Sequence, residues 1–335
     1  MQSTVEALVG DLSSRDHVVR DAALDGLVAL GPTAVHRLLP YTRDRESTIP
    51  NSSVRYVIKL LGDEGLLRLR EIRREGPGRP RSSALELLVD LGGADALDES
   101  DRRAVDRLVR IKILDERPVE TPSEGGRWLA FPADRLDDAV AALGLHDVRP
   151  ATSVMGVAAA TQAADSLEFR HADGEKHRAY RVFITPEFEN WRAEGPIKNW
   201  RMLWGNSFLD ELDGFLLARK LSERCGEAHF YVLDPYNSSD NWYVARDGHM
   251  VRSYGTYAEP QFGGEPLPFE AVQREIADED EAEAYAEGVP DAFTAADNLS
   301  VHPGPHLAED THGHGWLATT HPDVPNTRFK GALPL

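Results

Sequence analysis

An internal repeat is the feature of this sequence that most restricts its fold. Three consecutive segments in the first 93 residues match when they are aligned on a terminal glycine, with spacings of 31 and then 30 residues. The matching positions are Ala23, Leu27, Leu30 and Gly31, then Val54, Ile58, Leu61 and Gly62, then Ala84, Leu88, Leu91 and Gly92. Apolar residues that step by four and three lie on one helix face, and glycine readily takes the left-handed conformation that ends a helix. The spacing therefore predicts three second helices, each preceded by a first helix at 5–12, 34–41 or 65–72.

The first set of positions resembles a known repeat family. Asp16, Val19, Arg20, Ala23, Leu27, Leu30 and Gly31 look like the second helix of a short HEAT repeat, and residues 81–92 repeat most of the pattern. The middle unit departs from it, since Asn51 stands where the arginine is expected and the preceding loop is longer. The resemblance covers residues 3–93 and implies an α-solenoid, a scaffold that mostly binds other proteins; a minority of such folds bind DNA or carry chromophore-lyase activity. Three units are near the minimum for stability, so we expect the open end to pack on the following chain.

Beyond the repeat (1–93), the chain is expected to form two further parts. A length of 335 residues suggests two or three units. Residues 94–150 predict a connector of helix, hairpin and helix, with short strands VET and RWLAF around the turn signal PSEGG. A helix followed by a two-stranded wing is also typical of DNA-binding modules, but this segment has no basic recognition face. Residues 165–335 predict an α+β domain with an acidic segment and a histidine-rich C-terminal region.

The α+β prediction depends on a change to alternating periodicity near residue 165. The predicted strands are AYRVFITPEF, WRMLWG, EAHFYVLD, NWYVARDG and HMVRSYG. Asp247-Gly248 predicts a tight hairpin between the last two. The stretch NSFLDELDGFLLARKLSERCG predicts one long helix, with Ser207 as its N-cap. The predicted fold class is α+β: an N-terminal α-solenoid of HEAT-like helical hairpins, then a C-terminal antiparallel sheet covered by a long helix.

The C-terminal half carries a second, looser resemblance. Its order of strands and helix, from LDERPVE through NWYVARDGHMVRSYG to a closing strand GHGWLATT, resembles a group of actinobacterial proteins and the immunity-type (SMI1/KNR4-like) modules that bind and neutralise toxins. This resemblance implies a protein-binding role and transfers no catalytic residue. The tryptophans of this half either fill the core of the sheet or form a recognition surface, and core packing is the expected role for most of them.

The charge of the chain indicates which partners to expect. The net charge is −19, and residues 251–300 contain twelve acidic against two basic side chains. An acidic protein repels nucleic acid and anionic lipid, so we expect a protein partner and neither of these. The candidate binding residues lie in the turns of the repeat and in the acidic run: Arg43, Arg45, Arg79, Asp278, Glu279, Asp280, Glu281 and Glu283. Residues 78–81, Gly-Arg-Pro-Arg, resemble the core of an AT-hook, which leaves minor-groove binding as an alternative to a rigid turn between helices.

The C-terminal histidines are the place where a metal site is conceivable. In the stretch HLAEDTHGHGWLATTH, His312 and His314 would point the same way on a strand and could bind zinc together with a third ligand. The candidate ligands are His306, Asp310, His312, His314 and His321. Flanking prolines and glycines make the segment a poor rigid frame for a metal. A nucleophile elbow, a P-loop, a dinucleotide fingerprint and a His-Glu-x-x-His motif are absent from the sequence, so no catalytic residue is assigned.

Together these patterns predict a non-enzymatic interaction or scaffold protein, with toxin neutralisation as one form of that role and no cofactor. The alternative is a metal-dependent hydrolase or lyase that uses zinc at the C-terminal histidines. The N-terminal sequence MQSTVEALVG lacks the features of a signal peptide, and no run of apolar residues is long enough for a bilayer, so a cytoplasmic location is expected. The single cysteine, Cys225, is expected to be a small buried side chain without reactivity.

Overall fold

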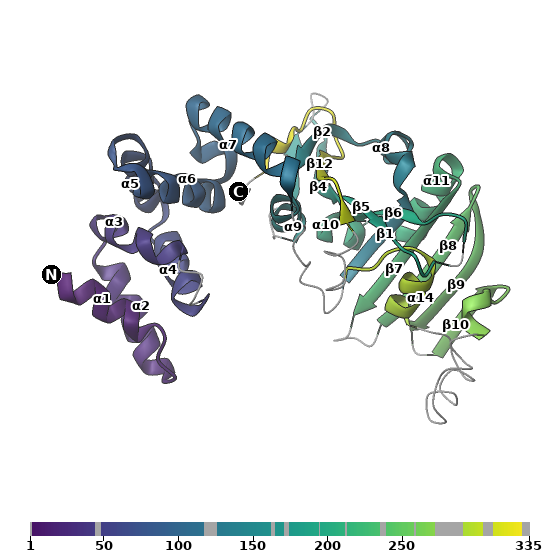
Figure 1. The fold of residues 1–335 in the computed structure, drawn as a ribbon, viewed down its shortest axis with the longest axis horizontal. Coiled ribbons are helices and arrows are strands. Elements are labelled where there is room, and N and C mark those ends of the chain that lie inside the picture. Colours follow the sequence, from purple (N-terminus) through teal and green to yellow (C-terminus); the bar gives the residue numbers. More distant parts are fainter. Residues whose placement is uncertain are drawn as a thin grey trace. The chain divides into compact units, whose positions relative to one another are not determined.

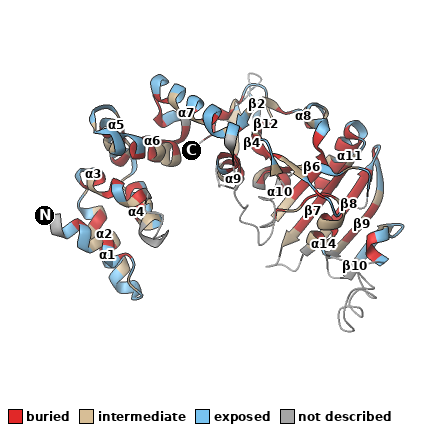
Figure 2. Ribbon diagram, in the orientation of Figure 1, coloured by how far each residue is buried: buried red, intermediate tan, exposed pale blue. Residues whose placement is uncertain are grey.

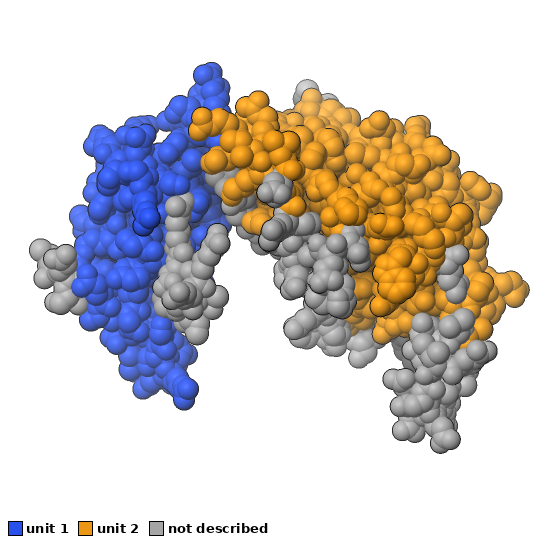
Figure 3. All heavy atoms as spheres, in the orientation of Figure 1, with its two compact units in different colours: residues 1–105, 330–335 blue, residues 106–329 orange. Residues whose placement is uncertain are grey.

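The computed structural model divides the chain into two compact units (Figure 3). The N-terminal unit holds residues 1–105 with 330–335, and the C-terminal unit holds residues 106–329. The structure describes residues 2–43, 48–116, 126–161, 165–170, 174–193, 195–211, 213–234, 239–257, 259–271, 291–303 and 311–329. None of the helices in these ranges has both the length and the apolar composition needed to span a membrane.

Helices that follow one another in pairs build the N-terminal unit (Figure 1). Their bounds are α1 Gln2–Asp11, α2 His17–Ala29, α3 Val35–Leu38, α4 Thr48–Leu60, α5 Gly62–Glu75 and α6 Gly78–Gly92. Each of the six helical segments predicted from the sequence overlaps with one of these helices. The apolar positions of the repeat form the packed faces, since Leu27, Leu38, Val54, Leu69 and Leu88 are fully buried.

Glycines end the second helices, with one difference from the prediction. Gly31 and Gly62 follow α2 and α4 and have φ angles of 68° and 56°. After α6 the residue with positive φ is Gly93, at 59°, so the prediction of Gly92 as the cap is wrong by one residue. Gly92 is needed for another reason, because a Cβ atom there would lie 2.3 Å from the Cβ of Ala96.

An arginine ties the second helix of the first and third pairs to the chain that precedes it. Arg20 in α2 donates from Nη1 to the carbonyl oxygen of Ser14 at 2.8 Å. Arg81 in α6 donates from Nε to the carbonyl oxygen of Arg73 at 2.9 Å. The carbonyl oxygen of Arg73 lies in the last turn of α5, where backbone acceptors lack partners within the helix, and Ser14 lies in the turn between α1 and α2. In the first and third pairs the repeated arginine therefore holds the chain that enters the second helix.

In the middle pair the same task falls to a residue one turn later. Asn51 occupies the position of the repeated arginine, and its Oδ1 accepts a hydrogen bond from Arg55 Nε at 3.0 Å. Arg55 reaches back to the carbonyl oxygen of Thr42 at 3.4 Å and forms an ion pair with Asp90 of α6 at 2.8 Å. Residues four apart share a helix face, so Arg55 can replace the missing arginine and also link α4 to α6.

Residues 126–151 contribute directly to the large sheet of the C-terminal unit. Helix α7 (Glu99–Lys112) comes first, and β1 (Gly126–Pro132), α8 (Leu136–Leu143) and β2 (His146–Ala151) follow the undescribed residues 117–125. Strand β1 lies in the interior of the sheet between two antiparallel partners, whereas the sequence placed RWLAF in a hairpin of a separate connector. The run Trp128 to Phe131 is fully buried on both faces, which is typical of an interior strand rather than of an exposed hairpin.

Antiparallel strands form the sheet (Figure 1), and within the described residues there are twelve of them. Its main order is β10-β9-β8-β7-β1-β6-β4-β12-β2. The further bounds are β3 Ser166–Arg170, β4 Lys176–Ile184, β5 Glu187–Glu189, β6 Asn199–Trp204, β7 Glu227–Asp234, β8 Ser239–Arg246, β9 His249–Tyr257, β10 Glu259–Gly264, β11 Thr311–His312 and β12 Gly315–Thr319. Asp247 and Gly248 join β8 to β9 with φ angles of 45° and 79°, as a tight turn with two positive φ values requires. The predicted α+β class with an antiparallel sheet is confirmed.

One face of the sheet packs on helices α8, α10 (Asn206–Glu211) and α11 (Gly214–Cys225). The sequence predicted a single helix from Asn206 to Cys225, and this prediction is wrong. Asp213 begins a second helix, because its carboxylate accepts the N–H groups of Phe215 and Leu216 at 3.0 and 3.2 Å. Gly214 at the restart packs so closely on the sheet that a Cβ atom there would lie 2.2 Å from the ring of Phe230.

The opposite face carries a continuous row of aromatic side chains. One aromatic residue from each of seven adjacent strands lies opposite the next: Phe183, Trp204, Trp128, Tyr231, Trp242, Tyr254 and Phe262. The rings of Trp128 and Tyr231 stack at 5.1 Å, and those of Tyr254 and Phe262 lie 5.5 Å apart. All but Phe262 are buried, and the interior strands are almost wholly buried in Figure 2. Cross-strand aromatic pairs stabilise a sheet, so this row sets the register of seven strands.

Three segments cover the aromatic row. Helix α9 (Ser153–Thr161) crosses β4, and Gly156 approaches so closely that a Cβ atom there would lie 2.0 Å from the ring of Phe183. Helix α14 (Ala292–Leu299) packs on β7 and β8, with the ring of Phe293 5.6 Å from that of Trp128. The third segment contains the buried Phe269, whose ring lies 5.8 Å from that of Trp242.

Loss of a central member of the row should destabilise the C-terminal unit strongly. Trp128→Ala removes a fully buried indole whose Nε1 donates to the carbonyl oxygen of Val301 at 3.0 Å. We expect the free energy of unfolding to fall by about 3–5 kcal/mol. The matched control is Trp191→Ala, at a tryptophan that is 68% exposed, where the change should stay within about 0.5 kcal/mol. Urea denaturation of both variants measures the difference, and similar losses in the two would contradict a special role for the row.

Candidate functional site

Large apolar side chains are exposed on the second helices of the N-terminal unit. Val18 in α2 is 61% exposed, and Tyr56 and Leu60 in α4 are 49% and 47% exposed. Tyr56 and Leu60 are four residues apart and therefore share one face of α4. Helices α2 and α4 are in contact with each other. We call Val18, Tyr56 and Leu60 the apolar strip. The helices bury most of their apolar repeat positions, such as Leu27, Val54 and Leu88, and leave this strip exposed to water.

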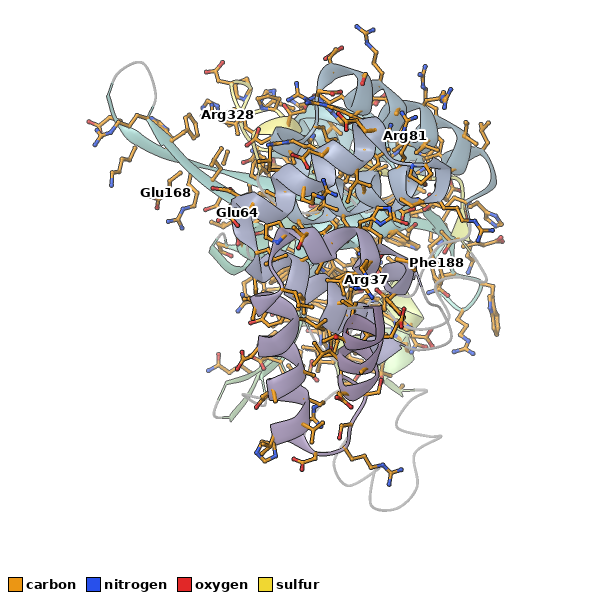
Figure 4. All side chains as sticks on the ribbon, turned by 90° about the vertical axis from the view of Figure 1, so that its left-hand side faces the viewer. Arg37, Glu64, Arg81, Glu168, Phe188 and Arg328 are labelled. Atoms are coloured by element: carbon orange, nitrogen blue, oxygen red, sulfur yellow. The ribbon has the colours of Figure 1, made fainter. Side chains whose placement is uncertain are left out.

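The turn between α5 and α6 gathers positive charge, and the sequence named its Arg79 as a binding residue. Arg79 is exposed. Residues 68–81 contain six arginines and two glutamates, in a chain whose net charge is −19. Arg68 forms an ion pair with Glu71 at 2.6 Å, and Arg73 forms one with Asp101 at 2.6 Å. Figure 4 looks onto this unit and labels Arg81 at the start of α6.

A small polar cavity opens beside this turn, with a volume of about 160 Å³. Its lining residues are Arg70, Arg74, Asp95, Ala96, Leu97, Asp98 and Asp101. Two of its three acidic members, Asp98 and Asp101, have hydrogen-bond or ion-pair partners. Asp98 accepts the N–H group of Asp101 at 2.9 Å and the hydroxyl of Ser100 at 2.8 Å, and these bonds, with the nearby Arg74, lower the pKa of Asp98.

The other binding residues that the sequence proposed are not brought to this turn within the described structure. Arg43 is the last residue of a short 3-10 helix, Leu39–Arg43, and the structure describes only the backbone of Arg43. Arg45 and the acidic residues between 278 and 283 lie outside the described residues. Their proposed roles remain predictions.

The structure separates the three histidines of the predicted metal site that it describes. Gly313 has a φ of 78°, which breaks the chain between β11 and β12, so that His312 and His314 do not share the face of one strand. His312 Nε2 lies 4.0 Å from Glu189 Oε2, while the ring of His314 packs on Trp316 with centroids 4.7 Å apart. The expectation that both point the same way is therefore wrong.

His321 has yet another environment, because its ring lies 4.7 Å from that of Phe169 on β3. His306 and Asp310 fall outside the described residues. Within the described part of the chain, no group of three histidine, cysteine, aspartate or glutamate side chains is placed to hold a metal ion.

A buried chain of hydrogen bonds on β7 was not foreseen from the sequence. Glu227 Oε1 and His229 Nε2 are 2.9 Å apart, His229 Nδ1 and Tyr231 Oη are 3.0 Å apart, and Tyr231 Oη lies 2.9 Å from Ser300 Oγ. Burial opposes ionisation of Glu227, but hydrogen bonds from His229 and Arg246 lower its pKa to about 2. Burial raises the pKa of the Tyr231 phenol.

This series of hydrogen bonds resembles a catalytic relay in its residue types, but a substrate cannot reach it. His229, Tyr231 and Ser300 are all fully buried. Its last member, Ser300, directly follows α14, so the chain joins the end of α14 to the sheet. Alternation along β7 shows that residues 227, 229 and 231 share a face, but nothing near them in the sequence points to Ser300. We therefore assign these hydrogen bonds a structural role.

Cys225 at the end of α11 is buried, and burial raises the pKa of its thiol to about 12, with a smaller contribution from Asp138. A thiol that stays protonated is a poor nucleophile and a poor metal ligand.

Comparisons of the chain with protein-family models, with curated proteins and with solved structures found no match. The functional assignment therefore rests on the residues of this chain.

The first turn of α14 should be sensitive to pH through Asp240. Asp240 Oδ1 accepts the N–H group of Ala292 at 2.8 Å. Burial, together with the nearby carboxylate of Asp291, raises the pKa of Asp240 from 3.8 to about 7. A folded-state pKa above the unfolded value favours the protonated folded form, so stability should fall as pH rises from about 4 to about 7.

Asp240→Asn keeps an acceptor for Ala292 and removes the charge. We expect this variant to be more stable than the parent at pH 8, by roughly 1–3 kcal/mol, and to differ little from it at pH 4.5. Asp247→Asn is the matched control, because the exposed turn residue loses the same charge and asparagine accepts its positive φ. Thermal unfolding across this pH range measures the effect; an equal response of both variants would contradict the assignment to Asp240.

Proposed function

We propose that this protein is a cytoplasmic, non-enzymatic scaffold that binds another protein through its N-terminal helices. The observation that carries the proposal is the apolar strip of Val18, Tyr56 and Leu60, which two adjacent second helices present to solvent. The helix pairs and their repeated arginines support a short HEAT-like α-solenoid, a fold class that mostly serves protein binding.

The physical cost of the strip supports a binding role. Burying apolar surface releases about 25 cal/mol per Å², so a partner that covers a group of large exposed apolar side chains gains binding free energy. Tyrosine is also among the residues that contribute most to protein interfaces. The C-terminal unit also exposes large apolar side chains, such as Trp191 and Leu216, but these two lie on separate segments. Tyr56 and Leu60 share one face of α4, which favours the N-terminal helices for docking.

An immunity-type role, in which the partner is a toxin, is the specific form of the proposal. The net charge of −19 supports it, because an acidic protein attracts a basic partner over long range and speeds association. The loose resemblance of the C-terminal half to immunity-type modules points the same way.

Changing the strip should abolish partner binding without unfolding the protein. We expect Tyr56→Asp combined with Leu60→Asp to weaken capture of the partner from a lysate of the source organism at least about tenfold, because charges replace the apolar contact. Leu67→Asp is the matched control, since Leu67 on α5 is 57% exposed and lies outside the strip. Quantitative affinity capture of parent and variants measures the effect.

Equal capture by the parent and the strip variant would contradict the proposal, provided that circular dichroism shows both to be folded. Metal content measured on the same preparation tests the alternative: one tightly held zinc ion per chain would favour the metal-dependent hydrolase or lyase instead.

A further inference from the structure

The turn between α5 and α6 has a chemistry opposite to that of the whole chain. We propose that Arg70, Arg74, Arg79 and Arg81, named here the arginine face, dock a segment rich in aspartate and glutamate on the protein partner. The inference rests on the proposed function and deepens it, because it states what the partner must carry.

The arginines around this turn differ in whether a carboxylate already forms an ion pair with them. Arg68 and Arg73 are each held by a carboxylate at 2.6 Å. Within the described residues, Arg74 and Arg79 have no ion pair, and Arg79 is exposed at the start of α6. Arg81 uses its Nε for the carbonyl oxygen of Arg73, so its bond holds the start of α6 against the end of α5. Arg74 in the last turn of α5 and Arg79 in the first turn of α6 therefore present their charges at the adjoining ends of two packed helices.

The local field adds to these charges. Helix α6 has no acidic residue in its first turn, and its N-cap residue Pro77 makes no side-chain hydrogen bond to the helix. The N-terminus of a helix carries a partial positive charge, which natural sequences usually balance with an acidic or capping side chain. Arginines at this end are unfavourable for α6 itself. An incoming carboxylate would relieve that repulsion.

Two arginines of this face, Arg70 and Arg74, line the cavity of about 160 Å³. Arg70 donates its Nε to the carbonyl oxygen of Ala96 at 3.1 Å, which holds the side chain in position. Three carboxylates, of Asp95, Asp98 and Asp101, line the same cavity. An acidic segment can therefore pair only with the solvent-exposed side of Arg74 and with the exposed Arg79. Guanidinium groups bind carboxylates with two parallel hydrogen bonds, which gives direction as well as attraction.

A protein segment fits this surface better than nucleic acid. Nucleic acid is a long polyanion that would also meet the acidic remainder of a chain with net charge −19. A short acidic segment needs to touch only the turn. The residues 78–81 that resemble an AT-hook begin a helix here, with Gly78 as the first residue of α6, whereas an AT-hook must lie extended in the minor groove.

The test uses fluorescence anisotropy of the full chain with three labelled probes: a short glutamate-rich peptide, the same peptide with glutamine in place of glutamate, and a short DNA duplex. We expect saturable binding of the glutamate peptide that weakens with salt, and no binding of the glutamine peptide. Arg74→Glu combined with Arg79→Glu should weaken the glutamate peptide about tenfold or more.

The matched control is Arg170→Glu combined with Lys176→Glu, which makes the same change of net charge on exposed residues of β3 and β4. Equal weakening by both pairs would overturn the proposal, since it would show a response to total charge alone. Tighter binding of the duplex than of the peptide, lost with Arg74 and Arg79, would also overturn it in favour of nucleic acid.

The peptide titration needs no partner, so it separates this inference from the proposed function. Failure of peptide binding, while the Tyr56 and Leu60 changes still abolish capture, overturns the arginine face and leaves the scaffold role standing. Peptide binding at the arginine face, with capture unaffected by the strip changes, supports the inference and contradicts docking through the strip.

Discussion

The aromatic row across seven strands is the interaction on which the C-terminal unit depends. Directly opposed side chains in antiparallel strands lie about 4.5–5.5 Å apart at Cβ, so each ring packs on the next across the sheet. A slip of one residue in any of these strands would turn its aromatic side chain to the other face, which α8, α10 and α11 already cover. The row therefore fixes register, and its polar atoms fix the cover: Trp128 binds the carbonyl oxygen of Val301, and Tyr231 binds Ser300.

The two units differ in which polar and apolar side chains are packed and which are exposed to solvent. Several polar groups on the aromatic face are paired inside the unit, as in the ion pair of Arg252 with Glu270 at 2.8 Å, where both side chains are buried. Breaking such a pair leaves a buried charge, which is strongly destabilising. In the N-terminal unit, Tyr56 and Leu60 on α4 and Arg79 at the start of α6 are exposed to solvent. The proposed scaffold role rests on these exposed side chains.

Local features of the fold could be predicted wherever neighbouring residues decide them. The helices of the repeat, the hairpin at Asp247-Gly248 and most strands follow from periodicity and turn residues. The errors arose where a specific side-chain or backbone contact overrides the apolar periodicity. Asp213 restarts a helix that looks continuous, Gly93 rather than Gly92 takes the cap, and Arg55 with Asn51 replaces an arginine that seemed to be missing. The exposed positions of the apolar strip were not foreseen, because an apolar residue in a repeat looks the same whether or not a neighbour covers it.

By itself, the sequence determined the helix pairs, the antiparallel α+β class and the excess of negative charge, because these depend on spacing, on turn residues and on composition. Only the tertiary structure decided that β1 is an interior strand, that seven aromatic residues line up, and that His312 and His314 lie in different surroundings. These outcomes depend on pairing between residues far apart in the chain. Trp128 contacts Tyr231 and Val301 only when the strands pair in the observed register, and no local sequence pattern predicts these contacts.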